Sequence, residues 1–191
     1  MTNTCQLSNN TKNYVEQYHC ILENMIQKMS AVKLTESISG SFITQMIPHH
    51  CAAIAMSENL LRYTTNIPLQ NIAMNIITSQ QKSIENMTAA YPECQCTMNY
   101  PEELSCYEQN NYNTIQSMFY EMKAARTENS IDANFMREMI PHHKGAVYMS
   151  ENALQFPVLP ALVPLLEEIV RSQKEGIRKM RYLLQNEMKC R

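Results

Sequence analysis

The residues of this chain best suited to chemistry are two adjacent histidine pairs, each flanked by methionines. Four of the five histidines fall in two matching blocks that lie 93 residues apart. Imidazole binds zinc, nickel and copper, while thioether sulfur adds a preference for Cu(I). The spacing therefore predicts paired metal sites, whose candidate ligands are Met46, His49, His50, Met56, Met139, His142, His143 and Met149.

These blocks belong to an internal repeat. Twelve of 20 positions are identical between FITQMIPHHCAAIAMSENLL, which starts at Phe42, and FMREMIPHHKGAVYMSENAL, which starts at Phe135. The same register continues on both sides of the blocks, from Tyr14 and Tyr107 to Met87 and Met180. A single period of this length indicates a duplication, with one repeat at 12–97 and the other at 105–190.

Each repeat is expected to contain three helices. Apolar residues recur at helical spacing, serine or aspartate precedes several of the runs, and no segment alternates as a strand does. The expected ranges are 13–33, 39 or 41 to 63, 68–91, 107–126, 132–155 and 160–188, with Asp132 as an N-cap. We predict an all-α protein in which two long helices of each repeat form a four-helix bundle, flanked by the first helix of each repeat. Three short helices make a thin core, so we expect 1–191 to form one fused domain.

Each histidine pair is expected to divide between two helix faces. On a helix, Met46, His49, His50, Ala53 and Ser57 fall within about a third of the circumference, but the adjacent histidines lie about 100° apart and cannot both point at one centre. We expect one ring to project into the bundle and the other to lie along a helix seam. Pro48 and Pro141 precede the pairs directly. We predict that they kink the interior of a helix, the alternative being the first turn of a shorter one.

Composition excludes several function classes. A formal charge of −2 gives no basic footprint for nucleic acid, and no apolar run is long enough to cross a membrane. The N-terminus as given shows no signal peptide, so we expect a cytoplasmic protein, or an envelope protein if a leader has been removed. Seven cysteines are an odd count, which favours free thiols over a disulfide framework.

Other chemistry is less well supported. Cys94, Cys96 and Cys106 form the one thiol cluster near the middle of the chain. Two ligands do not complete a site, so we interpret these as free thiols in an ordered connector between the repeats. None of the four histidines in the two blocks follows a glutamate by three residues; Glu16 and His19 alone have this spacing. A di-iron centre needs a Glu-x-x-His motif on each of two helices, so an oxidoreductase is disfavoured.

The histidine block resembles the signature M-I-x-H-H-x-x-A-x-x-M of a bacterial family called domain of unknown function 305. It stands here at 46–56 and again at 139–149, and the later Gln, Ile and Met element of the family resembles 80–87 and 173–180. The resemblance implies a ferritin-like helical bundle. A few members of the family are similar to copper-binding proteins, which implies that the methionines and histidines named above are ligands.

Together these features predict a metal-binding protein, with copper preferred and zinc or another transition metal as the alternative ion. Metal storage, resistance or trafficking would suit such a site, and we expect no enzymatic activity. The alternative function is a structural or interaction bundle in which the histidine blocks only pack. For the metal-binding function, the expected partner is a metal ion, and we expect neither nucleic acid nor a membrane as a partner. Homo-oligomerisation is left open.

Overall fold

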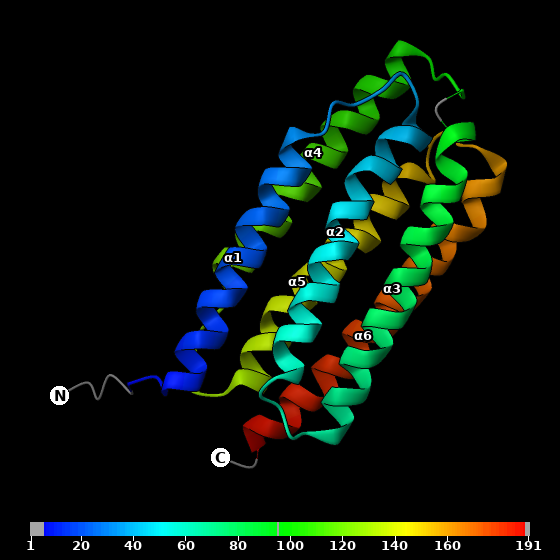
Figure 1. The fold of residues 1–191 in the computed structure, drawn as a ribbon. Helices are drawn as coiled ribbons and strands as arrows, with labels where there is room; N and C mark the ends of the chain where they lie inside the picture. The colour runs from blue at the N-terminus through cyan, green and yellow to red at the C-terminus, as the bar shows by residue number, and fades with distance from the viewer. Residues whose placement is uncertain (1–5, 95, 190–191) are drawn as a thin grey trace.

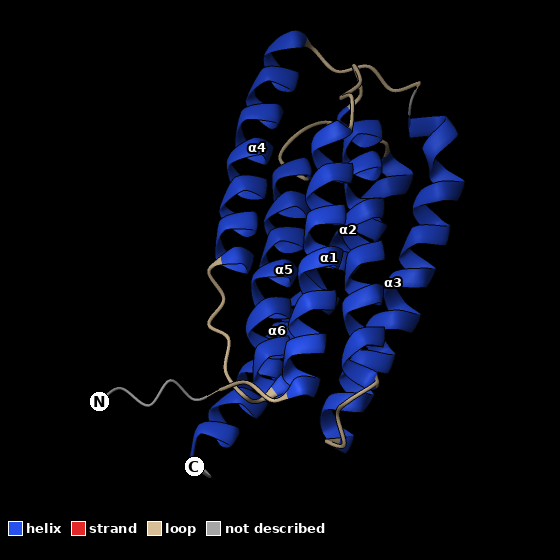
Figure 2. Ribbon diagram, turned by 60° about the vertical axis from the view of Figure 1, so that its left-hand side comes forward, coloured by secondary structure: helices blue, strands red, loops and turns tan. Residues whose placement is uncertain are grey.

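The part of the chain that the structure describes folds into six α-helices with one short 3₁₀ turn. The computed structural model describes residues 6–94 and 96–189, and in these ranges no strand occurs (Figures 1 and 2). The all-α prediction is confirmed. The elements are α1 (Asn9–Ala31), α2 (Ile38–Leu61), α3 (Ile67–Cys94), α4 (Pro101–Lys123), α5 (Ile131–Ala153), η1 (Pro160–Leu162) and α6 (Val163–Lys189).

Helices α2 and α5 lie side by side at the centre of the molecule (Figure 1). Within each repeat the packing is the same: α1 and α3 lie against α2, and α4 and α6 lie against α5. The two repeats meet through α2 and α5 and, at a second seam, through α3 and α6. These four helices form the expected bundle, with α1 and α4 flanking it. Its ferritin-like character stays a prediction.

One continuous apolar cluster runs through both repeats. Its largest fully buried side chains include the matched pairs Tyr14 and Tyr107, and Phe42 and Phe135. Burial of aromatic and methionine side chains on this scale supplies the main driving force for folding. The four candidate methionines belong to this cluster, and the four candidate histidines are buried within the same two helices, α2 and α5.

Serines begin the two central helices. The Ser37 hydroxyl accepts a hydrogen bond from the Gly40 N–H at the start of α2, and Ser130 does the same for Ala133 at the start of α5. The prediction of Asp132 as an N-cap is wrong, because that residue lies in the first turn of α5. A serine oxygen one residue before the helix satisfies an amide there that has no partner inside the helix.

The connector between the repeats is shorter than predicted. Helix α3 continues through Pro92 to Cys94, and α4 begins at Pro101, six residues before the expected start. Pro92 lies in the last turn of α3, where it removes one helical hydrogen bond, whereas Pro101 opens α4 at a position where the missing N–H has no partner to lose. Asn99 ties the connector to the bundle, since it accepts from the Ile38 N–H at 3.0 Å and donates to the Pro157 carbonyl at 2.8 Å.

Candidate metal centre

His49 and His142 meet at the seam between α2 and α5. The Nε2 atom of His49 lies 3.1 Å from the carbonyl oxygen of His142, and the Nε2 atom of His142 lies 3.1 Å from that of His49. The ring centroids are 3.7 Å apart and the ring planes differ by 32°. Both side chains are fully buried. Each repeat thus places one imidazole on the main chain of the other.

These contacts define which ring nitrogen carries a proton. A carbonyl oxygen only accepts hydrogen bonds, so Nε2 of each ring must be the donor. The neutral ring then leaves a lone pair on Nδ1. Neither the Nδ1 atom of His49 nor that of His142 has a hydrogen-bond partner in the described part of the chain. Both are therefore free to accept a proton or a metal ion.

Small side chains and internal prolines allow this approach. Ala53 and Ala146, one turn beyond the histidines, are completely buried, so α2 and α5 pack closely there. Pro48 and Pro141 both lie inside unbroken helices, which makes the first-turn alternative wrong. An interior proline leaves one main-chain carbonyl of the preceding turn without its helical partner.

His50 and His143 face a different seam, between α3 and α6. His50 lines a pocket of about 170 Å³, and His143 lines a neighbouring pocket of about 390 Å³. Gln80 and Gln173 line both pockets. Both nitrogens of His50 and the Nδ1 atom of His143 are buried without a hydrogen-bond partner among the described residues. The expected split of each pair between two faces is what the structure shows.

The two pockets are not equivalent. A β-carbon at Gly176 would lie 2.8 Å from Cδ2 of His143 and 2.9 Å from its Nε2, so only glycine leaves this ring in place. The matching position in the first repeat is Ser83, whose buried hydroxyl lines the His50 pocket without a hydrogen-bond partner in the described chain. His143 therefore packs against the α6 backbone, whereas His50 has a hydroxyl in its pocket.

Burial keeps all four imidazoles neutral. Desolvation lowers the pKa of His50 to about 3 and that of His142 to about 4, and it lowers the pKa values of His49 and His143 well below the usual value. Neighbouring imidazoles lower the pKa further for His49, His50 and His143. A neutral imidazole is the form that binds a metal ion.

The four methionines of the predicted site are also buried. Met46 and Met56 in α2, and Met139 and Met149 in α5, are each at most 1% exposed. On the helical wheel they fall on the same stripe as His49 and His142, which is the stripe that faces the central seam. The helix faces that carry His49 and His142 therefore also carry buried thioether side chains.

No conventional multidentate site is present within residues 6–94 and 96–189. In these ranges no three His, Cys, Asp or Glu side chains lie close enough to hold an ion. Cys94 is buried, while Cys96 and Cys106 are exposed, and all five described cysteines are free thiols. Gln95, which separates Cys94 from Cys96, lies outside the described residues, as do Cys5 and Cys190. Zinc prefers four nitrogen or sulfur ligands, so this donor set suits it poorly.

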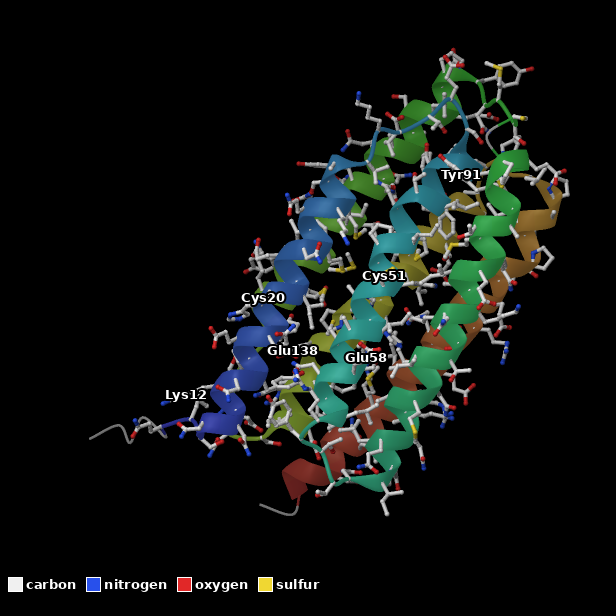
Figure 3. The ribbon with its side chains drawn as sticks, in the orientation of Figure 1. Lys12, Cys20, Cys51, Glu58, Tyr91 and Glu138 are labelled. Atoms are coloured by element: carbon white, nitrogen blue, oxygen red, sulfur yellow. The ribbon has the colours of Figure 1, made fainter. Side chains whose placement is uncertain are left out.

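The acidic residues near the blocks serve other purposes. Glu58 is exposed on α2 (Figure 3). Glu151 accepts from Lys174 of α6 at 2.6 Å, so neither carboxylate supports a histidine. In the same repeated segments, the amides of Asn59 and Asn152 donate to the main chains of α1 and α4 at 3.0 and 3.1 Å. The repeated Ser-Glu-Asn motif therefore binds the flanking helices.

Sequence reasoning missed one buried carboxyl group. Glu138 of α5 is 3% exposed and accepts a 2.6 Å hydrogen bond from the Tyr14 hydroxyl of α1. Burial raises the pKa of Glu138 to about 8 despite this bond, so the group is protonated at neutral pH. The first repeat has Gln45 at the same position, which accepts from Asn111. A neutral Gln at the matching position of the first repeat indicates that the position does not need a charge, which fits a buried site.

Comparison with known protein families finds a match over most of the chain. The sequence model of a family described as "Domain of unknown function (DUF305)" matches residues 7–91 and 40–184. None of the curated proteins compared matches the chain. No helix in the described ranges is both long and apolar enough to cross a membrane.

Several solved structures share the fold. CopM in the Cu(II)-bound form is 32% identical with a TM-score of 0.59, over 78% of this chain and 97% of that one. CopM in the Cu(I)-bound form is 29% identical with a TM-score of 0.57, over 81% and 98%. A DUF305 fragment from Deinococcus radiodurans, 22% identical with a TM-score of 0.56 over 78% and 96%, shares the fold alone.

Proposed function

Because this chain belongs to the DUF305 family, we propose that it is a copper-binding protein that holds Cu(I) on imidazole and thioether ligands. The observation that carries the proposal is the set of buried imidazole nitrogens without hydrogen-bond partners in the described chain. The large majority of buried side-chain polar atoms in proteins have a hydrogen-bond partner, so several orphaned nitrogens in one repeated motif need an explanation. A metal ion is such an explanation.

The donor chemistry favours copper over zinc. Neutral imidazole and thioether together suit soft Cu(I), and the described ranges offer no cluster of three nitrogen, oxygen or thiolate side chains. CopM, which resembles this chain over most of its length, has been solved with Cu(I), Cu(II) and Ag. Silver is likewise a soft ion, which suits the same kinds of ligand.

The two histidines of each pair take different roles. His50 and His143 line the pockets of the α3–α6 seam, so an ion from solvent meets these rings first. His49 and His142 lie deeper, with Nε2 engaged across the central seam and Nδ1 free. The methionines of the central stripe supply the thioethers, and bound copper would supply a charge that these neutral side chains lack. Storage, resistance and trafficking of copper all suit a site without an enzymatic constellation.

Copper binding can be tested by competition with a Cu(I) chelator under anaerobic conditions. The purified chain is expected to withdraw Cu(I) from bicinchoninate at a defined stoichiometry. Replacing His50 and His143 by leucine should weaken binding by at least tenfold, because each lost ligand bond is worth more than the 1.4 kcal/mol that this factor represents. The deeper pair should be tested in the same way.

The fifth histidine provides a matched control. His19 is exposed on α1, away from both seams, so His19→Leu should leave Cu(I) affinity unchanged. Methionine variants, Met46→Leu with Met139→Leu, test the thioethers while preserving volume. If all of these variants bind as the parent does, the copper site lies elsewhere. A folded parent chain that fails to compete for Cu(I) at all would support a bundle in which the histidines only pack.

A further inference from the structure

A groove with a strongly cationic rim lies between α5 and α6, away from both histidine seams. Its volume is about 550 Å³. We call it the basic groove and define it by its polar rim, Lys144, Tyr148, Lys174, Arg178, Arg181 and Tyr182. Val147 and Ile177, both nearly buried, form its apolar floor. This volume falls in the range of small-molecule sites.

Two of its four cations are already paired. Lys144 donates to Glu121 at 2.8 Å, and Lys174 donates at 2.6 Å to Glu151, which also lines the groove. Arg178 and Arg181 form no ion pair with any described residue. Glu175 lies near Arg178, but its carboxylate is bonded to Lys179 at 2.7 Å. The groove therefore keeps two available guanidinium groups in a chain whose formal net charge is −2.

The first repeat shows that the fold does not require these side chains. The six rim positions correspond, 93 residues earlier, to Cys51, Ala55, Gln81, Glu85, Thr88 and Ala89. None of these is cationic or aromatic, although α2 and α3 pack on each other as α5 and α6 do. The cations and tyrosines thus belong to the second repeat alone, so helix packing does not explain them.

The tyrosines add a second kind of recognition. Tyr148 is 55% exposed and Tyr182 is 66% exposed, which leaves both rings available for contact. A tyrosine ring contributes apolar area at little cost in conformational entropy, and guanidinium groups bind carboxylate and phosphate groups with two parallel hydrogen bonds. An apolar floor between aromatic rings and guanidinium groups suits a flat molecule with an anionic end.

We infer that the basic groove binds a small aromatic anion, that is, a ring carrying a sulfonate, carboxylate or phosphate group. Arg178 and Arg181 bind the anionic group, while Tyr148 and Tyr182 contact the ring above Val147 and Ile177. This activity does not depend on copper, because none of the predicted metal ligands lines the groove.

The test uses 8-anilinonaphthalene-1-sulfonate, an aromatic sulfonate whose fluorescence rises on binding. The whole chain should bind this probe saturably with one site. Arg178→Ala with Arg181→Ala should weaken binding at least tenfold, since hydrogen bonds to charged groups are among the strongest that proteins make. Arg62→Ala with Arg126→Ala, two exposed arginines elsewhere, changes the net charge equally and should have no effect.

Competition then identifies the anionic group. Displacement of the probe by adenosine monophosphate indicates a phosphate ligand, and displacement by 4-hydroxybenzoate indicates a carboxylate; either result supports the inference. Displacement by inorganic phosphate alone would overturn the role of the tyrosines. The double variant Tyr148→Leu with Tyr182→Leu should also bind the probe more weakly. Thermal unfolding checks that this variant is folded. Binding that is absent, or equal in the arginine variant and its control, refutes the site.

Discussion

Replacing His50 by leucine should stabilise the protein in the absence of metal. Both ring nitrogens of His50 are buried and have no hydrogen-bond partner among the described residues. In the neutral ring one of them is an N–H donor and the other an acceptor, so two polar groups lose their water without compensation. Leucine has a similar volume and carries no polar atom.

The magnitude follows from the cost of the two orphaned nitrogens. Each unsatisfied buried group costs about 1–3 kcal/mol, and a side chain of similar volume but different shape costs less than about 1.5 kcal/mol to fit. The two groups together cost about 2–6 kcal/mol, so after the packing cost we expect His50→Leu to raise the free energy of unfolding by roughly 0.5–6 kcal/mol. For a chain of this length the melting temperature should rise by roughly 5 °C.

The assay is urea unfolding of the metal-free chain with a copper chelator present, followed by far-ultraviolet circular dichroism. His49→Leu is the matched comparison. It forfeits the Nε2 hydrogen bond to the His142 carbonyl and places a branched side chain where two rings stack at 3.7 Å. We expect it to be less stable than His50→Leu by about 2 kcal/mol or more.

A clear loss of stability would refute this reasoning. If His50→Leu unfolds more than about 1 kcal/mol more easily than the parent, the ring contributes to packing or bonding in the metal-free state, and the structural explanation of the block gains support. If the variant is more stable but binds less Cu(I), the imidazole is kept at a cost to stability because it serves binding.

Three further predictions concern pH and packing. Glu138→Gln should stabilise the chain relative to the parent, increasingly from pH 5 to 8 and by about 1 kcal/mol per pH unit. The reason is that the folded pKa of Glu138 is about 8, so ionising this buried acid lowers the free energy of unfolding of the parent as pH rises. Thermal unfolding measures the effect, and the exposed Glu58→Gln variant is the control, without such a trend. The four buried histidines have the opposite effect, because their pKa values are lowered in the folded chain. Below pH 6.5 the free energy of unfolding should fall by up to about 1.4 kcal/mol per pH unit for each ring, as measured by acid unfolding of the metal-free chain. Gly176→Ala should displace the His143 ring and cost about 1–3 kcal/mol in urea unfolding, whereas Ser83→Ala, at the matching position, should not destabilise.

Much of the fold could be predicted because the repeat carries its own evidence. Helical spacing recurs in register over each block of three helices, and the helix faces of His49 and His50 follow directly from their adjacency. Boundaries near Pro92 and Pro101 were less predictable, because proline is compatible with both helix ends. The connector could therefore not be placed to within a turn.

The site was harder to predict, because its decisive contacts join residues from separate helices. No spacing reveals that Nε2 of His49 bonds to the main chain of His142, or that Gly176 makes room for His143. Glu138 was missed because a lone glutamate in a helix is normally exposed, and only its partner Tyr14 explains its burial. Contacts between residues of different helices were therefore the features that the sequence predicted least well.

The reciprocal imidazole contacts at the central seam also allow the two repeats to differ. A contact of this kind is isologous: each side gives and receives the same bond, as in a symmetric homodimer. A true homodimer would carry every substitution on both subunits. In a single chain the seam needs its histidine once in each repeat, while the outward faces can change independently. Cationic and aromatic side chains can therefore line the groove between α5 and α6, while the equivalent positions of α2 and α3 carry neither kind.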